Sequence, residues 1–277
     1  MISFSNYRKI LVEIREANIR SICIDLLHSQ KPAPGSLYIK HDVEVKLELA
    51  VRMARIEAEE GHRATYYVQG DLLRLPGAAE QLQEIGSLGH EVAYHYDVLD
   101  ASDGDYNAAL LEFKEYCDLF FETGFKITSV CPHGNPTKKR NGWKSNKDFF
   151  RLDYIRSEFP DLIDIVVDFP RLFPKGRYIS DAGRKLRIIG DISSNDHSEL
   201  SAIEDGRSIN WSEISDLVNS HSGVVLSLHP HRFYDNFVIN KIQIAVFFLL
   251  KNTYLKLRHY KLIRVIASRF YKLARRF

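Results

Sequence analysis

Short apolar runs alternate with helix-like patterns along most of the chain. Runs typical of buried strands occur at residues 21–27, 36–42, 64–70, 90–96, 127–131, 164–169, 187–192 and 224–229. From Leu47 the apolar residues recur at helical spacing until Gly61, and similar patterns predict helices over 78–85, 106–123 and 211–220. Alternating strands and helices predict a parallel sheet with helices outside it. The number of units favours a barrel, complete or broken, over an open sheet.

Composition fits one large α/β domain in a reducing compartment. The chain has 277 residues, of which 45% are hydrophobic, which is enough to bury a core and excludes a disordered chain. Cys23, Cys117 and Cys131 are odd in number and far apart, which excludes a disulfide framework. No apolar run reaches the roughly 18 residues of a membrane-spanning helix, and the N-terminus lacks the apolar core of a signal peptide. We therefore expect a cytoplasmic protein.

Charge divides the chain into two parts. Residues 236–277 hold ten Lys or Arg and no Asp or Glu, so residues 1–235 carry 28 basic against 36 acidic side chains. We expect a barrel over 1–235, whose acidity argues against a nucleic-acid partner, and a basic amphipathic helical extension over 236–277. Wound as a helix, residues 258–277 place basic and apolar side chains on opposite arcs, a pattern typical of helices on anionic membranes.

Two other interpretations of residues 258–277 stay open. The apolar arc of the helix can pack on the barrel or in a dimer, with the basic arc in solvent, or the segment can be disordered. The sequence does not indicate an oligomeric state.

Reactive side chains follow four of the predicted strands. Asp42 and Glu44 come at the end of the second strand, and His95, His133 and His229 come at the ends of three later ones. Ligands of parallel α/β folds bind at the carboxyl ends of strands. These carboxylates and imidazoles are therefore candidate ligands of one metal ion. Each also has a structural interpretation, since a single histidine is often structural and Asp42 can cap the following helix.

Other histidines and one thiol are expected to be structural. Strand alternation places His41 and His231 on the face opposite to the candidate site, and His90 lies at an odd offset from His95. Cys131 is expected to be a small buried thiol.

Four segments occur in an order that resembles a known family. They are HDVE at 41–44, GHEVAYHYD at 89–97, PHGNP at 132–136 and LSLHPH at 226–231. Together they resemble the motifs of the polysaccharide deacetylases, carbohydrate esterase family 4, and more narrowly the subgroup with an HDVD-type first motif from bacterial surface-polysaccharide gene clusters. The resemblance runs from about Tyr38 to His231. It implies a distorted (β/α) barrel of about seven strands, here with a C-terminal helical extension, and metal-dependent removal of an acetyl group from a sugar.

The resemblance implies roles for the metal-binding residues. The first motif of the family supplies a catalytic base and a carboxylate that binds the metal, and these two positions correspond to Asp42 and Glu44. Asp42 is the preferred base, but which of the two residues binds the metal stays open. Glu44 stands where the subgroup has Asp. The second motif places one metal-binding histidine at His95, whereas its second place falls on Leu99, which cannot bind a metal. His133 is the expected replacement in a site for one divalent ion, with zinc the expected metal.

The later motifs imply the rest of the catalytic site. Backbone N–H groups around His133, Gly134 and Asn135 would stabilise the oxyanion. His229 would be the general acid, and Asp181 would orient it or bind substrate.

The resemblance predicts a metal-dependent deacetylase of an amide-bearing sugar, nucleotide- or lipid-linked, in O-antigen or capsule biosynthesis. The basic helix would hold such an enzyme at the inner face of the cytoplasmic membrane. Two alternatives remain: a degenerate glycan-binding protein, marked by Leu99 and Glu44, and another metal-dependent amide hydrolase on the same barrel.

Overall fold

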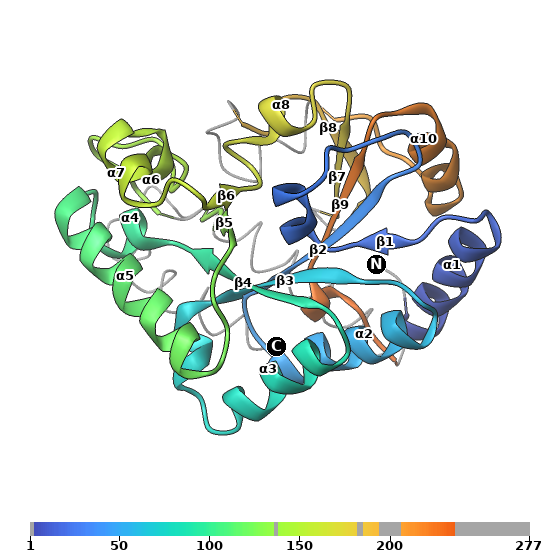
Figure 1. The fold of residues 1–277 in the computed structure, drawn as a ribbon, viewed down its shortest axis with the longest axis horizontal. Coiled ribbons are helices and arrows are strands. Elements are labelled where there is room, and N and C mark those ends of the chain that lie inside the picture. Colours follow the sequence, from blue (N-terminus) through green and yellow to red (C-terminus); the bar gives the residue numbers. More distant parts are fainter. Residues whose placement is uncertain (1–2, 136–137, 182–184, 194–205, 236–277) are drawn as a thin grey trace, which may run out of the picture.

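The computed structural model describes residues 3–135, 138–181, 185–193 and 206–235 (Figure 1). The predicted extension at 236–277 lies outside the described residues, so the division into domains stays a prediction. In the described part of the chain, no helix is long and apolar enough to cross a membrane.

One curled sheet forms the centre of the molecule (Figure 1). Its strands follow the order β6-β5-β4-β3-β2-β9-β7-β8, with β1 beside β2. All neighbouring strands are parallel except β7 and β8. The ends of this order, β6 and β8, do not pair with each other in the described residues, so the barrel is incomplete. The strands are β1 Ser21–Ile22, β2 Leu37–Val43, β3 Ala64–Gln69, β4 Glu91–Tyr96, β5 Ser129–Pro132, β6 Ile163–Asp164, β7 Arg177–Ser180, β8 Arg187–Ile189 and β9 Val224–Leu228.

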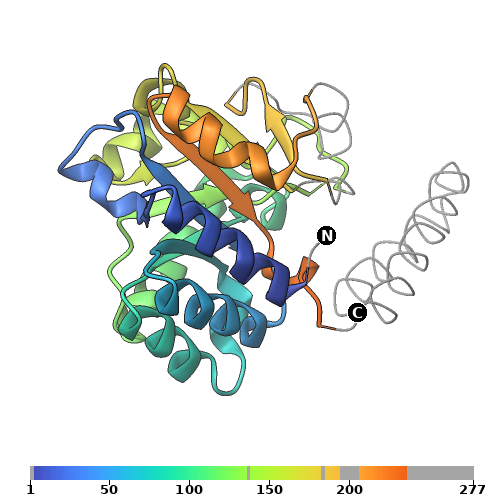
Figure 2. The same cartoon turned by 90° about the vertical axis from the view of Figure 1, so that its right-hand side faces the viewer.

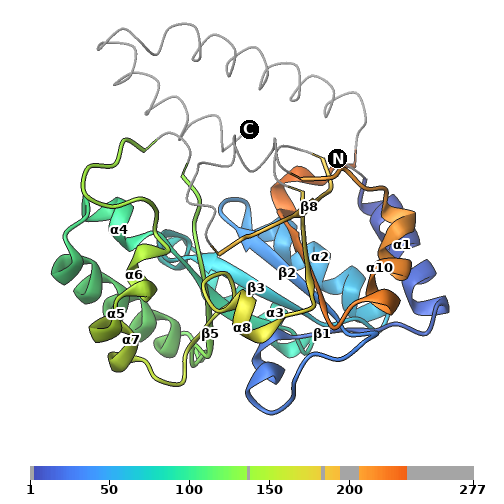
Figure 3. The same ribbon diagram turned by 90° about the horizontal axis from the view of Figure 1, so that it is seen from above.

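Helices cover the outer face of this sheet. Figure 2 shows α10, α1, α2 and α3 along the outside, and Figure 3 shows α5 and α10 on opposite sides of the strands. The α-helices are α1 Phe4–Glu16, α2 Leu47–Glu59, α3 Ala78–Ser87, α4 Val98–Ala101, α5 Tyr106–Glu122, α6 Asp148–Arg151, α7 Asp153–Glu158, α8 Phe169–Leu172 and α10 Ile214–Ser220. Short 3-10 helices are η1 Ile24–His28, η2 Gly70–Arg74, η4 Trp211–Glu213 and η5 Pro230–Arg232.

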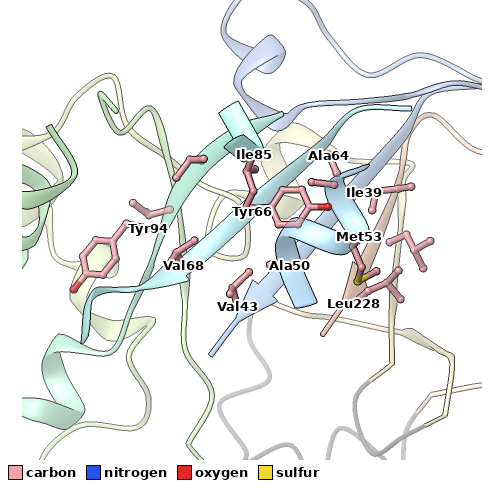
Figure 4. Packing of buried hydrophobic residues seen from close by; sticks show 14 of the residues in the cluster. Ile39, Val43, Ala50, Met53, Ala64, Tyr66, Val68, Ile85, Tyr94 and Leu228 are labelled. Atoms are coloured by element: carbon pink, nitrogen blue, oxygen red, sulfur yellow. The ribbon is translucent and has the colours of Figure 1, made fainter. Parts of the chain in front are cut away.

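Strand β2 separates the outer core from the inside of the curl. Ile39 and Val43 belong to the apolar cluster beneath the helices, together with Ala50 and Met53 of α2 (Figure 4). Tyr38, two residues from Lys40, belongs to a second cluster on the other face. Because side chains alternate along a strand, Lys40, Asp42 and the following Glu44 share the inner face with Tyr38. This alternation directs the polar residues of β2 into the curl.

The predicted α/β fold with a distorted barrel is confirmed, with nine strands in the described residues rather than about seven. Some predicted elements were wrong. Residues 21–27 form only the two-residue β1 before η1, because the side chains of Thr65 and Glu91 accept the N–H groups of Ile24 and Asp25. Of the strand predicted at 164–169, only Asp164 lies in a strand.

In that second segment, β6 ends at Asp164. Its carboxylate accepts the N–H groups of Val166 and Val167 at 3.0 and 2.9 Å, which turns the chain towards α8. The strand predicted at 187–192 shortens to β8 and pairs antiparallel with β7, while α1 and β7 were not predicted.

Candidate metal and catalytic site

Three potential metal ligands meet at the carboxyl ends of β2, β4 and β5. The carboxylate of Glu44 lies 3.3 Å from Nε2 of His133 and 3.9 Å from Nε2 of His95. One ligand atom from each residue lies within 4.8 Å of the others, and all three residues are buried. The compact set of one carboxylate and two imidazoles fits a divalent ion such as zinc.

The tautomer of His95 is suited to metal binding. Its Nδ1 lies 2.9 Å from the backbone carbonyl of Cys131, which can only accept a hydrogen bond. Nδ1 therefore carries a hydrogen, so that on binding a cation the neutral ring would offer the lone pair of Nε2 on the side of Glu44. Burial alone would lower the pKa of His95, but Asp42 and other neighbours outweigh it and raise the pKa. The negative surroundings that cause this shift also favour a bound cation.

Asp42 lies beside these ligands and has different partners. Its Oδ1 accepts a hydrogen bond from Nζ of Lys40 at 2.6 Å, and its Oδ2 accepts one from the hydroxyl of Ser227 at 3.3 Å. Burial would raise the pKa of Asp42, but the positive charge of Lys40, followed by His95 and His229, outweighs burial and lowers it. Asp42 is therefore an ionised carboxylate held in one orientation.

Lys40 was not among the residues predicted for the site. Its side chain is fully buried, and its Nζ also lies 2.9 Å from Sγ of Cys131. The available signal was its position two residues before Asp42, on the same face of a strand that is otherwise expected to be buried.

A second group of potential ligands consists of Asp42, His95 and Cys131. The ammonium group of Lys40 contacts both Asp42 and Cys131, so it would repel a cation placed there. The group of Glu44, His95 and His133 is therefore the better metal site.

His229 and Asp181 form a buried pair at the opposite side of the site. Nδ1 of His229 lies 2.6 Å from Oδ1 of Asp181, whose other oxygen accepts the backbone N–H of His229 at 3.1 Å. Arg232 also donates to Oδ1 at 3.0 Å. Burial would raise the pKa of Asp181, but Arg232 and His229 outweigh it and lower the pKa to about 2. Nε2 of His229 lies 3.9 Å from the carboxylates of both Asp42 and Glu44.

The loop after β5 requires one change to the predicted oxyanion donors. The backbone N–H of His133 donates to the carbonyl of Tyr96 at 2.7 Å, continuing the contact between β4 and β5. That N–H group is therefore not available to an oxyanion. Gly134 and Asn135 follow it directly, at the edge of the described loop.

The remaining predicted positions have clear surroundings. Leu99 is fully buried in α4 as part of the outer core, and it offers no ligand. His41 contacts Glu57 at 2.7 Å, and His90 contacts the backbone of Ala64 and Ala54, so both have structural hydrogen bonds.

His231 differs from its prediction. Its ring centroid lies 5.6 Å from that of His229, beside the site rather than on the opposite face. The reason is that β9 ends at Leu228 and η5 begins at Pro230, so strand alternation does not extend to residue 231.

No protein-family model and no curated protein matches the chain. Among solved structures it is similar to a CE4 esterase from Streptococcus mutans, with 12% identity, a TM-score of 0.43, and coverage of 74% of this chain and 76% of that one. It is similar to the catalytic domain of a peptidoglycan N-acetylglucosamine deacetylase from Eubacterium rectale, with 14% identity, a TM-score of 0.41, and coverage of 79% and 87%. A CE4 family pseudoenzyme from Bacillus anthracis shows 14% identity, a TM-score of 0.39 and coverage of 73% and 56%, so this chain spans little more than half of that protein. A functional assignment therefore depends on the residues of this chain.

Proposed function

We propose that this protein is a metal-dependent hydrolase that removes an acetyl or related acyl group from the amide nitrogen of a sugar. The observation that carries the proposal is one buried site that joins three ligands, Glu44, His95 and His133, to an ionised carboxylate and an imidazole. Three protein ligands with room for a fourth are typical of catalytic zinc sites. The motifs that resemble the polysaccharide deacetylases support the choice of an acylated sugar as substrate.

The contacts favour distinct roles for the two carboxylates. Glu44 faces the histidine Nε2 atoms, as a metal ligand would, and Asp42 faces Lys40 and Ser227. We therefore assign Glu44 to the metal and Asp42 to proton transfer.

Each step of amide hydrolysis can then be assigned to a residue of the site. Glu44, His95 and His133 would hold the divalent ion, whose chemistry when bound is Lewis acidity towards an acyl carbonyl and a water molecule. Asp42 accepts the proton of the attacking water, and Lys40 keeps Asp42 ionised for this purpose. The N–H of Gly134 donates to the oxyanion, a contact typically worth about 3–4 kcal/mol.

The leaving group needs an acid on the far side of the site. His229 donates a proton from Nε2 to the sugar nitrogen as the amide bond breaks. Asp181 holds the Nδ1 hydrogen and stabilises the imidazolium form, which fixes the direction of proton donation.

The finer assignment concerns the biological substrate. We propose a nucleotide- or lipid-linked sugar of bacterial surface polysaccharide synthesis, processed at the cytoplasmic face of the membrane. The resemblance of the segment HDVE to the HDVD-type first motif supports the pathway, and the basic arc predicted for residues 258–277 supports the location.

The alternative is a deacetylase-like fold that binds glycans without hydrolysing them. Leu99 and Glu44 favour it, because both depart from the motifs of the family. Metal content separates the two functions, since a degenerate site would be purified without its ion.

The test combines elemental analysis with an acetate-release assay. Full-length protein should bind about one divalent ion per chain and release acetate from at least one member of a panel of N-acetylated nucleotide sugars, lipid-linked sugars and oligosaccharides. His95→Ala should lose the ion, whereas Asp42→Asn should keep the fold and lose turnover by roughly 10²–10⁴-fold. A full metal content in His95→Ala would refute the site, and metal-free protein that binds glycans without releasing any acyl group would favour the alternative.

A further inference from the structure

We infer that Asp100 and Asn146 position His133 as a metal ligand, in place of the ligand that Leu99 cannot supply. The inference rests on the proposed metal site and adds the residues that hold it in shape. Leu99 and Asp100 are neighbours in α4, which begins directly after Asp97 at the end of β4. Leu99 is buried in the outer core, so α4 offers the site no ligand at that position.

Asp100 instead organises the long loop that follows His133. Its carboxylate accepts two hydrogen bonds from the guanidinium of Arg140, at 2.8 and 2.7 Å, and one from Nε1 of Trp143 at 2.9 Å. Asp100 is almost completely buried, so this charge has to be compensated by such partners. The bidentate contact between Arg140 and the carboxylate of Asp100 favours one fixed orientation of both side chains.

Asn146 connects this cluster to the backbone of His133. Its amide nitrogen donates to Asp100 at 3.1 Å and to the carbonyl of His133 at 2.8 Å. Its amide oxygen accepts the backbone N–H of Asp100 at 3.0 Å, which fixes the orientation of the amide. Since the N–H of His133 already donates to Tyr96, both backbone polar groups of this ligand are held, one from each side.

The cluster gives rigidity to a segment without regular structure. Between β5 and α6 the described residues form neither helix nor strand. Trp143 closes the cluster by packing on Gly104, where φ is +85° and a Cβ atom would lie 2.3 Å from the indole. Arg140 also donates to the carbonyl of Asn135 at 3.2 Å. The backbone that carries His133 is thus held by contacts outside the metal site, which restricts where its imidazole can lie beside Glu44.

The inference is tested on full-length protein by measuring zinc affinity against a competing chelator. Asn146→Ala should raise the Kd for zinc by roughly 10–100-fold, the range found for residues that orient ligands. The visible spectrum of the cobalt-loaded variant should change in the same direction as that of His133→Ala. Ser129→Ala is the matched control, because Ser129 is equally buried on β5 and bonds to Glu91 and Tyr67 away from the loop.

Each outcome separates the positioning role from the alternatives. The control should lower Tm without changing zinc affinity or the cobalt spectrum. If Asn146→Ala does not fold, Asp100→Asn preserves the side-chain shape and should shift Kd and spectrum in the same direction. Wild-type Kd and spectrum in the folded variant, with a metal-binding wild type, would overturn this inference alone. A wild type that binds no metal would overturn the proposed function as well.

Discussion

Replacing Lys40 by methionine should destabilise the protein, and more so at pH 8 than at pH 5. Lys40 is fully buried, and its ammonium is the charged partner of Asp42 at 2.6 Å. Methionine has a similar length and no charge, so the main change is an unpaired buried carboxylate rather than a large cavity. Breaking a buried pair by removing one partner typically costs about 3–5 kcal/mol.

The pH dependence follows from the pKa of Asp42. In the wild type this pKa lies below its usual value, because Lys40, His95 and His229 outweigh burial. The stabilisation by ionised Asp42 is therefore present above the unfolded pKa of about 3.9 and is lost as pH falls through the lower folded pKa. Burial is the largest single influence on this pKa, so without Lys40 we expect burial to outweigh His95 and His229 and the folded pKa of Asp42 to rise above the unfolded value. The effect of pH on stability then reverses. The variant loses stability at high pH, where Asp42 is ionised, and regains stability as the pH falls and Asp42 takes up a proton.

Urea unfolding of metal-free protein at the two pH values measures this effect. A double-mutant cycle with Asp42→Asn is the control, because an uncharged partner should remove most of the penalty of Lys40→Met. An equal loss at pH 5 and pH 8, or single losses that simply add in the double variant, would refute the role of the pair.

Three further predictions concern the acid, the unusual ligand and the basic segment. Asp181→Asn should lower kcat roughly 10²–10⁴-fold with unchanged metal content, because His229 loses its orienting carboxylate; an unchanged kcat would contradict that role. Glu44→Asp should weaken zinc binding in a chelator competition, because the shorter side chain withdraws from His133, now 3.3 Å away; wild-type affinity would argue against Glu44 as ligand. The full-length protein should co-sediment with anionic liposomes and be released from them by high salt, and removing residues 258–277 should end this binding. Equal recovery of both proteins in the supernatant would favour packing of the segment on the protein.

The convergence of the site could be predicted because parallel strands end at one edge of a sheet. Asp42 and Glu44 are far in sequence from His95 and from His229, yet all of them lie at the carboxyl ends of strands whose apolar pattern is strong. Neither exact strand bounds nor side-chain contacts were needed for that prediction. The prediction that His231 lies away from the site was wrong because it depended on the exact end of the last strand. β9 stops at Leu228, so side-chain alternation does not reach residue 231.

The contacts that tune the site could not be read from the sequence. Asn146 reaches the carbonyl of His133 across a loop with no periodic pattern, and a single asparagine there carries no signal of that contact. The turn after β6 was missed for a related reason. Residues 164–169 look like a buried strand, but the carboxylate of Asp164 competes for the backbone N–H groups and ends it.

The inner face of β2 links the fold to the chemistry more directly than any single motif. Lys40, Asp42 and Glu44 follow one another at two-residue intervals, so successive side chains stand roughly 6–7 Å apart along the strand. Lys40 contacts Asp42, and Glu44 contacts His133, so the middle carboxylate is the one that a neighbouring ammonium keeps ionised. Glu44, which departs from the HDVD-type motif, and His133, the expected replacement for the ligand missing at Leu99, meet in one contact of 3.3 Å. A degenerate site gives no reason for these two residues to meet in this way, whereas the proposed site would require a carboxylate that reaches the replacement histidine.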